Sequence, residues 1–340
     1  MISWSAAACG LDVGGRRRRA AALQGAALLL VASAVNADHL FVTNERAGTL
    51  TVIDTGTDAV IGTMNIGNRP RGIAAAGNRL YIAVSQWRDR PRTGREAIVA
   101  VDARKLKIVR EYKAGTDPEV VTVAGARLYL SNEDAGTASI VDVASGKHLA
   151  TLVVGTEPEG VTLSPEGRLA YVSCESSNTV TVIDTRAQKV VANILVDPRP
   201  RASIFSRDGK RAWVSSEIGS SISLIDPATH RVTKRLRLGG TDRPVGMALS
   251  TDEKRLYVAT GRGNSILVVD PALTRVLARI PVGSRPWYIA MTPDGRKLYV
   301  ANNLSNDVSV IDIATSRVVK TIRVGDGPWG IAVATRPAAP

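Results

Sequence analysis

The chain has 340 residues, of which 44% are apolar and 22% charged, and this composition excludes a disordered or collagen-like protein. Lysine and arginine number 44 against 31 aspartates and glutamates, so the net charge is +13. Only 4% of the residues are aromatic, so we expect an aliphatic core. Two cysteines and three widely spaced histidines exclude a disulfide framework and a cysteine-based zinc cluster, and they argue against a histidine-rich metalloenzyme.

The first 37 residues have the pattern of a secretory signal peptide. Four arginines at 16–19 precede an uncharged run rich in alanine, leucine and valine. Val35 and Ala37 then occupy the −3 and −1 positions of a cleavage site. We expect residues 1–37 to be removed and the mature protein to be periplasmic, because no other apolar run approaches the length of a membrane span. The alternative is a retained membrane anchor.

The rest of the chain is built on a repeat of about 42 residues. Each unit contains two apolar residues followed by an aspartate, and a proline comes 16 residues later in six units and 18 residues later in the seventh. A period of this length is typical of a β-propeller. The seven aspartates are Asp54, Asp102, Asp142, Asp184, Asp226, Asp270 and Asp312, and the seven prolines are Pro70, Pro118, Pro158, Pro200, Pro244, Pro286 and Pro328.

Each unit divides into four short apolar runs that are joined by turn sequences. In one unit, residues 298–301 and 308–311 are two such runs, and Thr292–Arg296 contains the Pro-Asp-Gly of a tight hairpin turn. Four strands joined as a meander form one propeller blade, and nothing in the chain predicts a sustained helix. We therefore predict an all-β, seven-bladed propeller with four-stranded blades over residues 38–335, followed by a short tail at 336–340.

The two ends of the repeat are predicted to close the ring. The repeat begins at 39–42 with the sequence of a second strand and ends at 329–334 with the sequence of a first strand. The last strand should therefore complete the blade that the N-terminal segment opens, and this arrangement leaves no open sheet edge at the closure.

The residues that flank the seven prolines should ring one mouth of the central channel. This ring is segregated in charge, because two neighbouring blades carry only carboxylates there while others carry arginine and two carry tryptophan. Such a mouth can hold an anionic group on arginine and stack a planar or sugar-like body on tryptophan. The alternative is solvated loop charge with arginine–carboxylate pairs across the ring. The candidate ligand-binding residues are Arg69, Arg71, Glu119, Glu159, Arg201, Arg285, Trp287 and Trp329.

Two further features belong to the same face. A second ring of carboxylates follows the second strands, and it suggests either a site for a hard cation or separate loop charges that never meet; we predict no metal, because the ligands come from separate blades. These carboxylates are Glu45, Glu133, Glu175 and Glu217. A basic insertion at 86–96 is either a binding loop or a tolerated surface loop. At the opposite face, the seven aspartates are expected to cap their own turns.

Segments such as Leu298–Asn303 and Val324–Gly330 resemble the YVTN-type β-propeller repeat, and the resemblance extends over essentially all of residues 38–335. Among such proteins, the chain is most similar to the periplasmic propellers associated with PQQ-dependent alcohol catabolism in bacteria. This resemblance implies a periplasmic protein without an established catalytic site, in the context of quinoprotein alcohol oxidation. No PQQ-binding residue is carried over, because the single cysteine of the mature chain excludes the vicinal disulfide of the quinoprotein dehydrogenases.

We therefore predict a non-enzymatic propeller without a cofactor, which binds a protein partner or a small anionic ligand at this mouth. The partner that the resemblance implies is a periplasmic quinoprotein dehydrogenase or a cytochrome c. The first alternative is a lactonase-like hydrolase, against which we count the absence of histidine from the ring positions. The second is a propeller that binds single-stranded DNA, which the net positive charge favours and the acidic blades disfavour.

Overall fold

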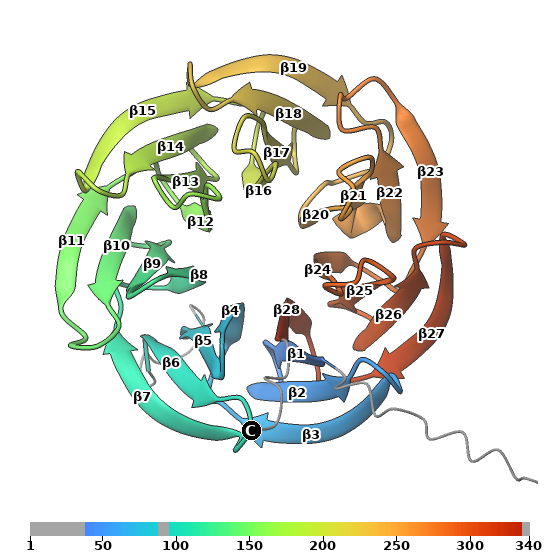
Figure 1. Ribbon diagram of the computed structural model, residues 1–340, viewed down its shortest axis with the longest axis horizontal. Coiled ribbons are helices and arrows are strands. Elements are labelled where there is room, and N and C mark those ends of the chain that lie inside the picture. The colour runs from blue at the N-terminus through green and yellow to red at the C-terminus, as the bar shows by residue number, and fades with distance from the viewer. Residues whose placement is uncertain (1–37, 88–94, 335–340) are drawn as a thin grey trace, which may run out of the picture. The chain divides into compact units, whose positions relative to one another are not determined.

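The computed structural model describes residues 38–87 and 95–334, which belong to the second of two units of the chain, residues 36–340. The predicted signal peptide, the centre of the basic insertion and the predicted tail lie outside the described residues. The described residues form seven four-stranded sheets around a central axis (Figure 1). The prediction of an all-β, seven-bladed propeller is confirmed. In the described ranges, no helix is long and apolar enough to cross a membrane.

The innermost strand of each blade lies along the central channel, and six of the seven begin at a repeat proline. The exception begins three residues after Pro244, in the unit with the longer spacing. The inner strands are β4 (Pro70–Ala76), β8 (Pro118–Ala124), β12 (Pro158–Leu163), β16 (Pro200–Phe205), β20 (Met247–Leu249), β24 (Pro286–Met291) and β28 (Pro328–Ala334).

The second and third strands are buried almost throughout, because each is flanked by strands of its own blade and by the faces of neighbouring blades. The second strands are β1 (His39–Asn44), β5 (Arg79–Val84), β9 (Arg127–Asn132), β13 (Leu169–Cys174), β17 (Ala212–Ser216), β21 (Leu256–Ala259) and β25 (Lys297–Asn302). The third strands are β2 (Thr49–Asp54), β6 (Ala97–Asp102), β10 (Thr137–Asp142), β14 (Thr179–Asp184), β18 (Ser221–Asp226), β22 (Ser265–Val269) and β26 (Asp307–Asp312).

The outermost strands present most of their side chains to solvent. They are β3 (Ala59–Asn65), β7 (Lys107–Lys113), β11 (His148–Val153), β15 (Lys189–Leu195), β19 (Arg231–Arg237), β23 (Val276–Pro281) and β27 (Arg317–Arg323). The helical content of the described residues is a single 3₁₀ turn, η1, at Gly261–Gly263.

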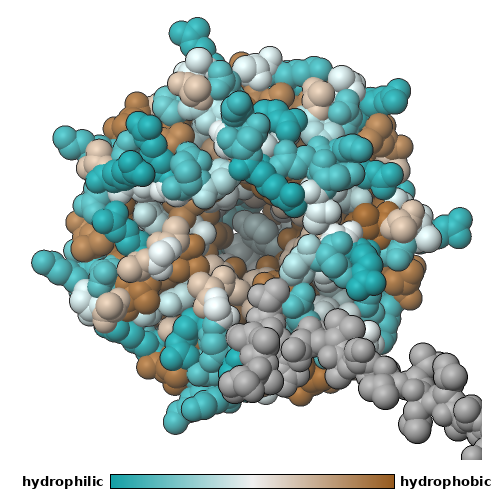
Figure 2. All heavy atoms as spheres, in the orientation of Figure 1, coloured by the Kyte–Doolittle hydropathy of each residue, from teal (hydrophilic) through white to brown (hydrophobic). Residues whose placement is uncertain are grey.

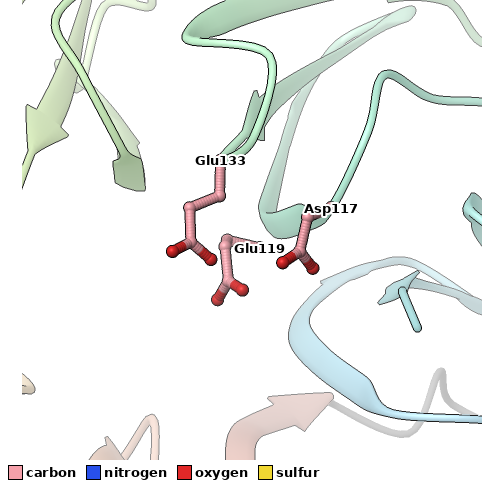
Figure 3. A group of neighbouring side chains, drawn as sticks. All are labelled: Asp117, Glu119 and Glu133. Atoms are coloured by element: carbon pink, nitrogen blue, oxygen red, sulfur yellow. The ribbon is translucent and has the colours of Figure 1, made fainter. Parts of the chain in front are cut away.

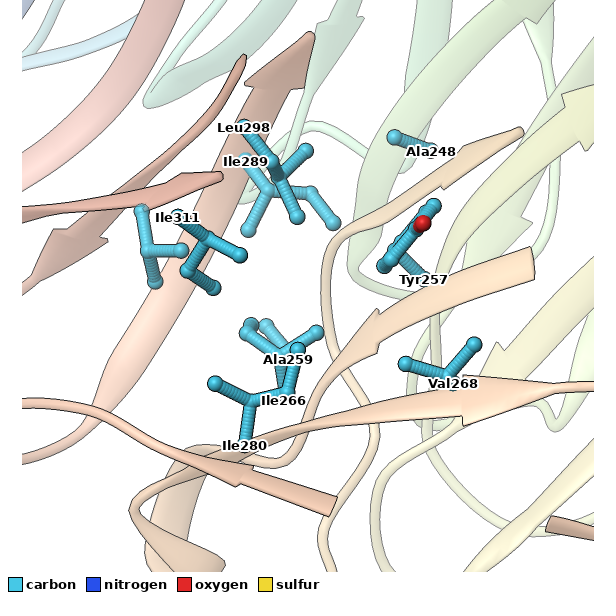
Figure 4. Close-up of a cluster of buried hydrophobic side chains, with 10 residues drawn as sticks. Ala248, Tyr257, Ala259, Ile266, Val268, Ile280, Ile289, Leu298 and Ile311 are labelled. Carbon is cyan, nitrogen blue, oxygen red and sulfur yellow. The ribbon is translucent and has the colours of Figure 1, made fainter. Parts of the chain in front are cut away.

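The apolar core lies between adjacent blades. In one cluster, side chains of β20–β23, such as Ile266 and Ile280, pack against Ile289, Leu298 and Ile311 of the next blade (Figure 4). Full burial of one such aliphatic side chain contributes roughly 1.5–3 kcal/mol. Seven interfaces of this kind hold the blades together, and they leave the polar residues at the strand ends to form the two faces.

Ring closure follows the prediction. The C-terminal strand β28 pairs in antiparallel register with β1, and Ile331 lies opposite Val42 while Ala332 lies opposite Phe41. One blade therefore consists of the strands in the order β28, β1, β2 and β3, in which the first strand comes from the far end of the repeat.

The repeat aspartates cap the turns that follow the third strands, as predicted. The carboxylate of Asp312, for example, accepts hydrogen bonds from the hydroxyl and the backbone N–H of Thr315, both at 2.7 Å. These bonds hold the pKa of Asp312 below its usual value, because they favour the charged form. Asp142 and its own partner Ser145 form the same pair of bonds. Each of these turns is therefore stabilised within its own blade.

Candidate functional site

The starts of the inner strands and the loops after the second strands meet at one mouth of the channel. They enclose a cavity of about 260 Å³. Figure 2 shows the ring from one side, in the orientation of Figure 1, with the central channel as a hollow. The cavity is lined by Glu45, Arg69, Arg71, Glu133, Glu159, Arg199, Arg201, Arg285, Trp287, Asn303 and Trp329.

The structure brings seven of the eight predicted ligand-binding residues to this cavity. The eighth, Glu119, lies behind the lining with none of its surface exposed, and its carboxylate contacts Arg71. The sequence prediction missed Arg199 and Asn303 as members of the site. Both stand at ring positions, so the repeat register was the signal that could have found them.

The residues before the repeat prolines share a backbone feature. In six blades the residue before the repeat proline has a positive φ, in the left-handed region that favours glycine. Five of these residues are charged rather than glycine, and such strain costs of order 1 kcal/mol each. The residues are Arg69, Asp117, Glu157, Arg199, Arg285 and Gly327, with φ between 43° and 69°.

Backbone hydrogen bonds fix these turns to the loops after the second strands. The carbonyl of Asp117 accepts a bond from the N–H of Glu133 at 2.8 Å, and the carbonyl of Arg199 accepts one from Glu217 at 2.8 Å. The two rings that were predicted separately are therefore one structure, in which each loop is tied to the proline turn of its own blade.

Arg201 is the centre of one buried ion-pair network. Its Nε donates a hydrogen bond to Glu217 at 2.7 Å, and its Nη1 lies 2.6 Å from Glu175 and also contacts Glu159. Arg199 contacts two of the same carboxylates, Glu175 at 2.5 Å and Glu217 at 3.4 Å. The pairing across the ring that we considered as an alternative is thus present, but around a buried guanidinium rather than in solvated loops.

Arg71 and Arg69 form the second network, on the neighbouring side of the mouth. The Nη1 of Arg71 donates to Glu45 at 3.0 Å, and its Nη2 contacts Glu119. Arg69 donates to Asp117 at 2.6 Å and to Glu45 at 3.2 Å. Its guanidinium also lies 5.5 Å from the ring of Trp87, so the described start of the basic insertion is at the mouth.

Three carboxylates, Asp117, Glu119 and Glu133, gather beside Arg69 and Arg71. Figure 3 shows them directed toward one another, and one oxygen of each lies within 4.8 Å of the others. The two guanidiniums already supply positive charge to this group, through Asp117 and Glu119. The cluster is therefore part of the ion-pair network.

Burial divides the protonation states of the mouth carboxyls. It raises the pKa of Glu119 well above its usual value, and burial together with the charge of Glu159 raises the pKa of Glu133. Burial also raises the pKa of Glu175, as do its hydrogen bond with Glu159 and the charge there. Burial would raise the pKa of Glu159 too, but the charges of Arg201 and Arg71 outweigh it and lower that pKa. The Glu159–Glu175 pair therefore holds one proton near neutral pH.

The two tryptophans are neighbours, as ring closure predicts, but they are not an open stacking platform. Their ring centroids are 6.4 Å apart, and Trp287 and Trp329 are only 5% and 2% exposed. Arg71 lies over Trp329 at 4.4 Å, while Arg285 and Arg201 lie over Trp287 at 4.8 Å and 5.4 Å. The pair forms an apolar base on which the arginines rest.

Comparison with known proteins gives a partial family match and many matches of fold. A family model described as YNCE-like beta-propeller matches residues 246–338. No curated protein matches the chain. The PQQ-associated subtype that the sequence suggested is not confirmed by the family match.

Among solved structures, a putative 6-phosphogluconolactonase from Bacteroides uniformis has a TM-score of 0.74 at 17% identity, covering 88% of this chain and 100% of that chain. The periplasmic gluconolactonase PpgL of Pseudomonas aeruginosa has 0.72 at 20%, covering 88% and 99%. Kuenenia stuttgartiensis hydrazine synthase has 0.68 at 22%, covering 79% and 96%. At these identities the likeness shows the fold.

These findings correct the functional prediction. We predicted a non-enzymatic binding protein, and that prediction is wrong: the solved propellers of this fold include gluconolactonases, which favour the lactonase-like alternative. The argument against an enzyme was the lack of histidine at the ring. The structure weakens that argument, because buried glutamates with raised pKa values can also accept and donate protons, as histidine does elsewhere.

Proposed function

We propose that this protein is a lactonase-like hydrolase, which opens a cyclic ester by adding water at the channel mouth. The observation that carries the proposal is the cavity of about 260 Å³, on which buried arginines and a glutamate with a raised pKa converge. The likeness of fold to gluconolactonase propellers supports it. The cavity is large enough for a single sugar-sized ring.

Hydrolysis of a lactone needs a base for the water, positive charge for the oxyanion and a proton for the leaving oxygen. Glu133 lines the cavity, and burial raises its pKa, which makes it a stronger base than an ordinary carboxylate, so it is our candidate general base. Arg71 and Arg201 line the same cavity and are held by several carboxylates each, so they are placed to stabilise the oxyanion without rearranging. The Glu159–Glu175 pair holds the proton that the leaving oxygen requires.

The step balances with water as the only co-reactant. A water proton passes to Glu133 while the water oxygen bonds to the carbonyl carbon. The ring C–O bond then breaks, and the released alkoxide takes a proton from the Glu159–Glu175 pair. The products are a hydroxyl group and a carboxylic acid on one open chain, and proton exchange with solvent restores the glutamates.

The test is hydrolysis of glucono-1,5-lactone by the purified protein, followed by acid release and corrected for the spontaneous reaction. We expect Glu133→Gln to lower kcat by about 100-fold or more, because Gln cannot accept the proton. Glu166→Gln, on an exposed turn between β12 and β13, is the matched control and should leave the rate unchanged. The proposal fails if this lactone, its 6-phosphate and glucaro-1,4-lactone are all opened no faster than in buffer. It also fails if Glu133→Gln retains the full rate.

The finer assignment of location is also a proposal. We propose that the protein acts in the periplasm, supported by the signal-peptide pattern of residues 1–37, and that it belongs with the propellers of quinoprotein oxidation, supported by the resemblance of its repeats. N-terminal sequencing of the exported protein should find Asp38 as the first residue. Recovery of chains that retain Met1 would contradict it.

A further inference from the structure

The arginines of the mouth differ in how their charge is neutralised. Arg69, Arg71, Arg199 and Arg201 each contact two or more carboxylates. Arg285 lines the same cavity, yet its guanidinium has neither an ion pair nor a hydrogen bond with any residue that the structure describes. Among the arginines that line the cavity, it is the one that the described residues leave without a carboxylate partner.

Arg285 is held in place without using its donors. Its guanidinium stacks over Trp287 at 4.8 Å, and the guanidinium of Arg201 lies over the same ring at 5.4 Å. Its backbone N–H donates to Asn264 at 2.9 Å, and its carbonyl accepts a bond from the N–H of Asn303 at 2.9 Å. The backbone of Arg285 has a positive φ of 56°, and its side chain lines the cavity. The guanidinium is therefore positioned while its N–H groups remain available.

Charges of both signs surround Arg285. Burial lowers its pKa most, the charges of Glu217 and Glu45 oppose this, and the charges of Arg201 and Arg262 support it, so the net shift is downward. A partly buried cation without a counter-ion is unfavourable, so an anion brought by a ligand gains more here than at an exposed arginine. A guanidinium also presents paired donors that match the two oxygens of a carboxylate or a phosphate.

We propose that Arg285 is the specificity-determining anion site of this mouth, and that the substrate is a lactone that carries a separate acidic group, a carboxylate or a phosphate. The assignment of the substrate as a lactone rests on the proposed function, whereas the anion site rests on the unpaired guanidinium of Arg285. The acidic group binds Arg285, while the ester carbonyl lies toward Arg71 and Arg201 across the same cavity.

The experiment compares three lactones that differ in the acidic group: glucono-1,5-lactone (neutral), 6-phosphoglucono-1,5-lactone (phosphate) and glucaro-1,4-lactone (carboxylate). We expect the wild type to prefer one of the acidic lactones, which identifies the anion. Arg285→Gln should lower kcat/KM for that lactone by roughly 10- to 100-fold, mainly through KM, and change the neutral lactone by less than about threefold. Arg243→Gln is the matched control, because Arg243 precedes the repeat proline of the preceding blade but does not line the cavity.

Binding of the open-chain acids separates this inference from the proposed function. Titration calorimetry with 6-phosphogluconate and glucarate should show binding that Arg285→Gln weakens to a similar degree and Arg243→Gln does not. If no lactone is hydrolysed but this pattern of binding appears, the anion site stands and the hydrolase proposal falls. If Arg285→Gln affects all three lactones equally, or leaves binding of both acids unchanged, the inference is overturned.

Discussion

Two sets of carboxylates mark the two ends of the propeller, and they behave in opposite ways. At the face opposite the mouth, which we call the floor, the repeat aspartates such as Asp312 accept hydrogen bonds from their own turns, and their pKa values are lowered. At the mouth, glutamates such as Glu119 and Glu175 are bound by arginines, and their pKa values are raised by burial. The floor set is the same in every blade, whereas the mouth set differs from blade to blade.

This difference separates the parts of the repeat that build the scaffold from those that form the candidate site. A turn that is closed by its own aspartate folds independently of its neighbours, so repeating it seven times builds a scaffold. An ion pair between a carboxylate of one blade and an arginine of another forms only when the blades pack together. Arg201, for example, contacts Glu159 of the preceding blade and Glu217 of its own. The departures from the repeat therefore converge on the mouth, where the candidate chemistry lies.

We expect the largest effect when the mouth network loses its central arginine, Arg201. Arg201→Leu leaves Glu159, Glu175 and Glu217 with reduced neutralising charge in a buried setting, and removing one partner of such a network costs about 3–5 kcal/mol. Urea unfolding at pH 7 measures the loss. Arg296→Leu, in an exposed pair with Asp294 at the floor, should change stability by less than about 0.5 kcal/mol. Equal losses in the two variants would contradict the comparison.

The second prediction uses pH to distinguish the two sets. Burial and Glu159 raise the pKa of Glu175 to about 8, so the folded state holds a proton there that the unfolded chain loses near its ordinary value of 4.5. The free energy of unfolding should therefore fall as pH rises between these two values, by about 1–2 kcal/mol once partial exposure is allowed for.

Glu175→Gln tests this directly, because the amide mimics the protonated acid and does not titrate. Its free energy of unfolding, measured by urea from pH 5 to pH 9, should fall by less than that of the wild type over the same range. Glu166→Gln, outside the mouth, serves as the control and should follow the wild-type curve. A variant curve that runs parallel to the wild type would assign the pH dependence to other groups.

The sequence predicted the fold fully and the site in part, for reasons that particular residues make clear. The spacing from Asp54 to Pro70 depends on one blade, so the repeat alone specifies it, and closure by β28 follows from the order of the strands. The positions of Arg71 and Glu159 beside their repeat prolines likewise predicted that both lie at one mouth. Burial was not accessible in this way, because the contact of Arg71 with Glu119 joins two blades and its depth depends on the closed ring.

The same limit explains why the functional prediction failed. The repeat does not reveal the surroundings of a glutamate, and nothing in it shows that Glu175 lies beside the ionised Glu159. Similarly, Trp287 and Trp329 were expected to offer open faces, but guanidiniums cover them. The raised pKa values in this mouth arise from burial and pairing of ordinary residue types, and those properties exist only after folding.

The smallest expected effect concerns the floor. Asp312→Ala removes the two bonds from Thr315 but leaves the strands β26 and β27 and every blade interface in place. Because the turn is exposed and water replaces the lost bonds, we expect the melting temperature at pH 7 to fall by no more than about 2 °C. Lactone hydrolysis should be unchanged, since the floor aspartates contact no residue of the mouth cavity.

The pH dependence of this small loss has the opposite sign to that of Glu175. The pKa of Asp312 is lowered in the folded state, so its contribution is present above the ordinary value near 3.8 and is lost as pH falls through the folded value. The difference in melting temperature between Asp312→Ala and the wild type should therefore shrink as pH is lowered toward 3, whereas the difference for Glu175→Gln grows as pH is raised toward 9. Calorimetric scans of both variants across this range measure the two trends together. If the Asp312 difference exceeded about 10 °C, or persisted unchanged at pH 3, the floor aspartates would be part of a cooperative network like that of the mouth, and the contrast between the two ends would not hold.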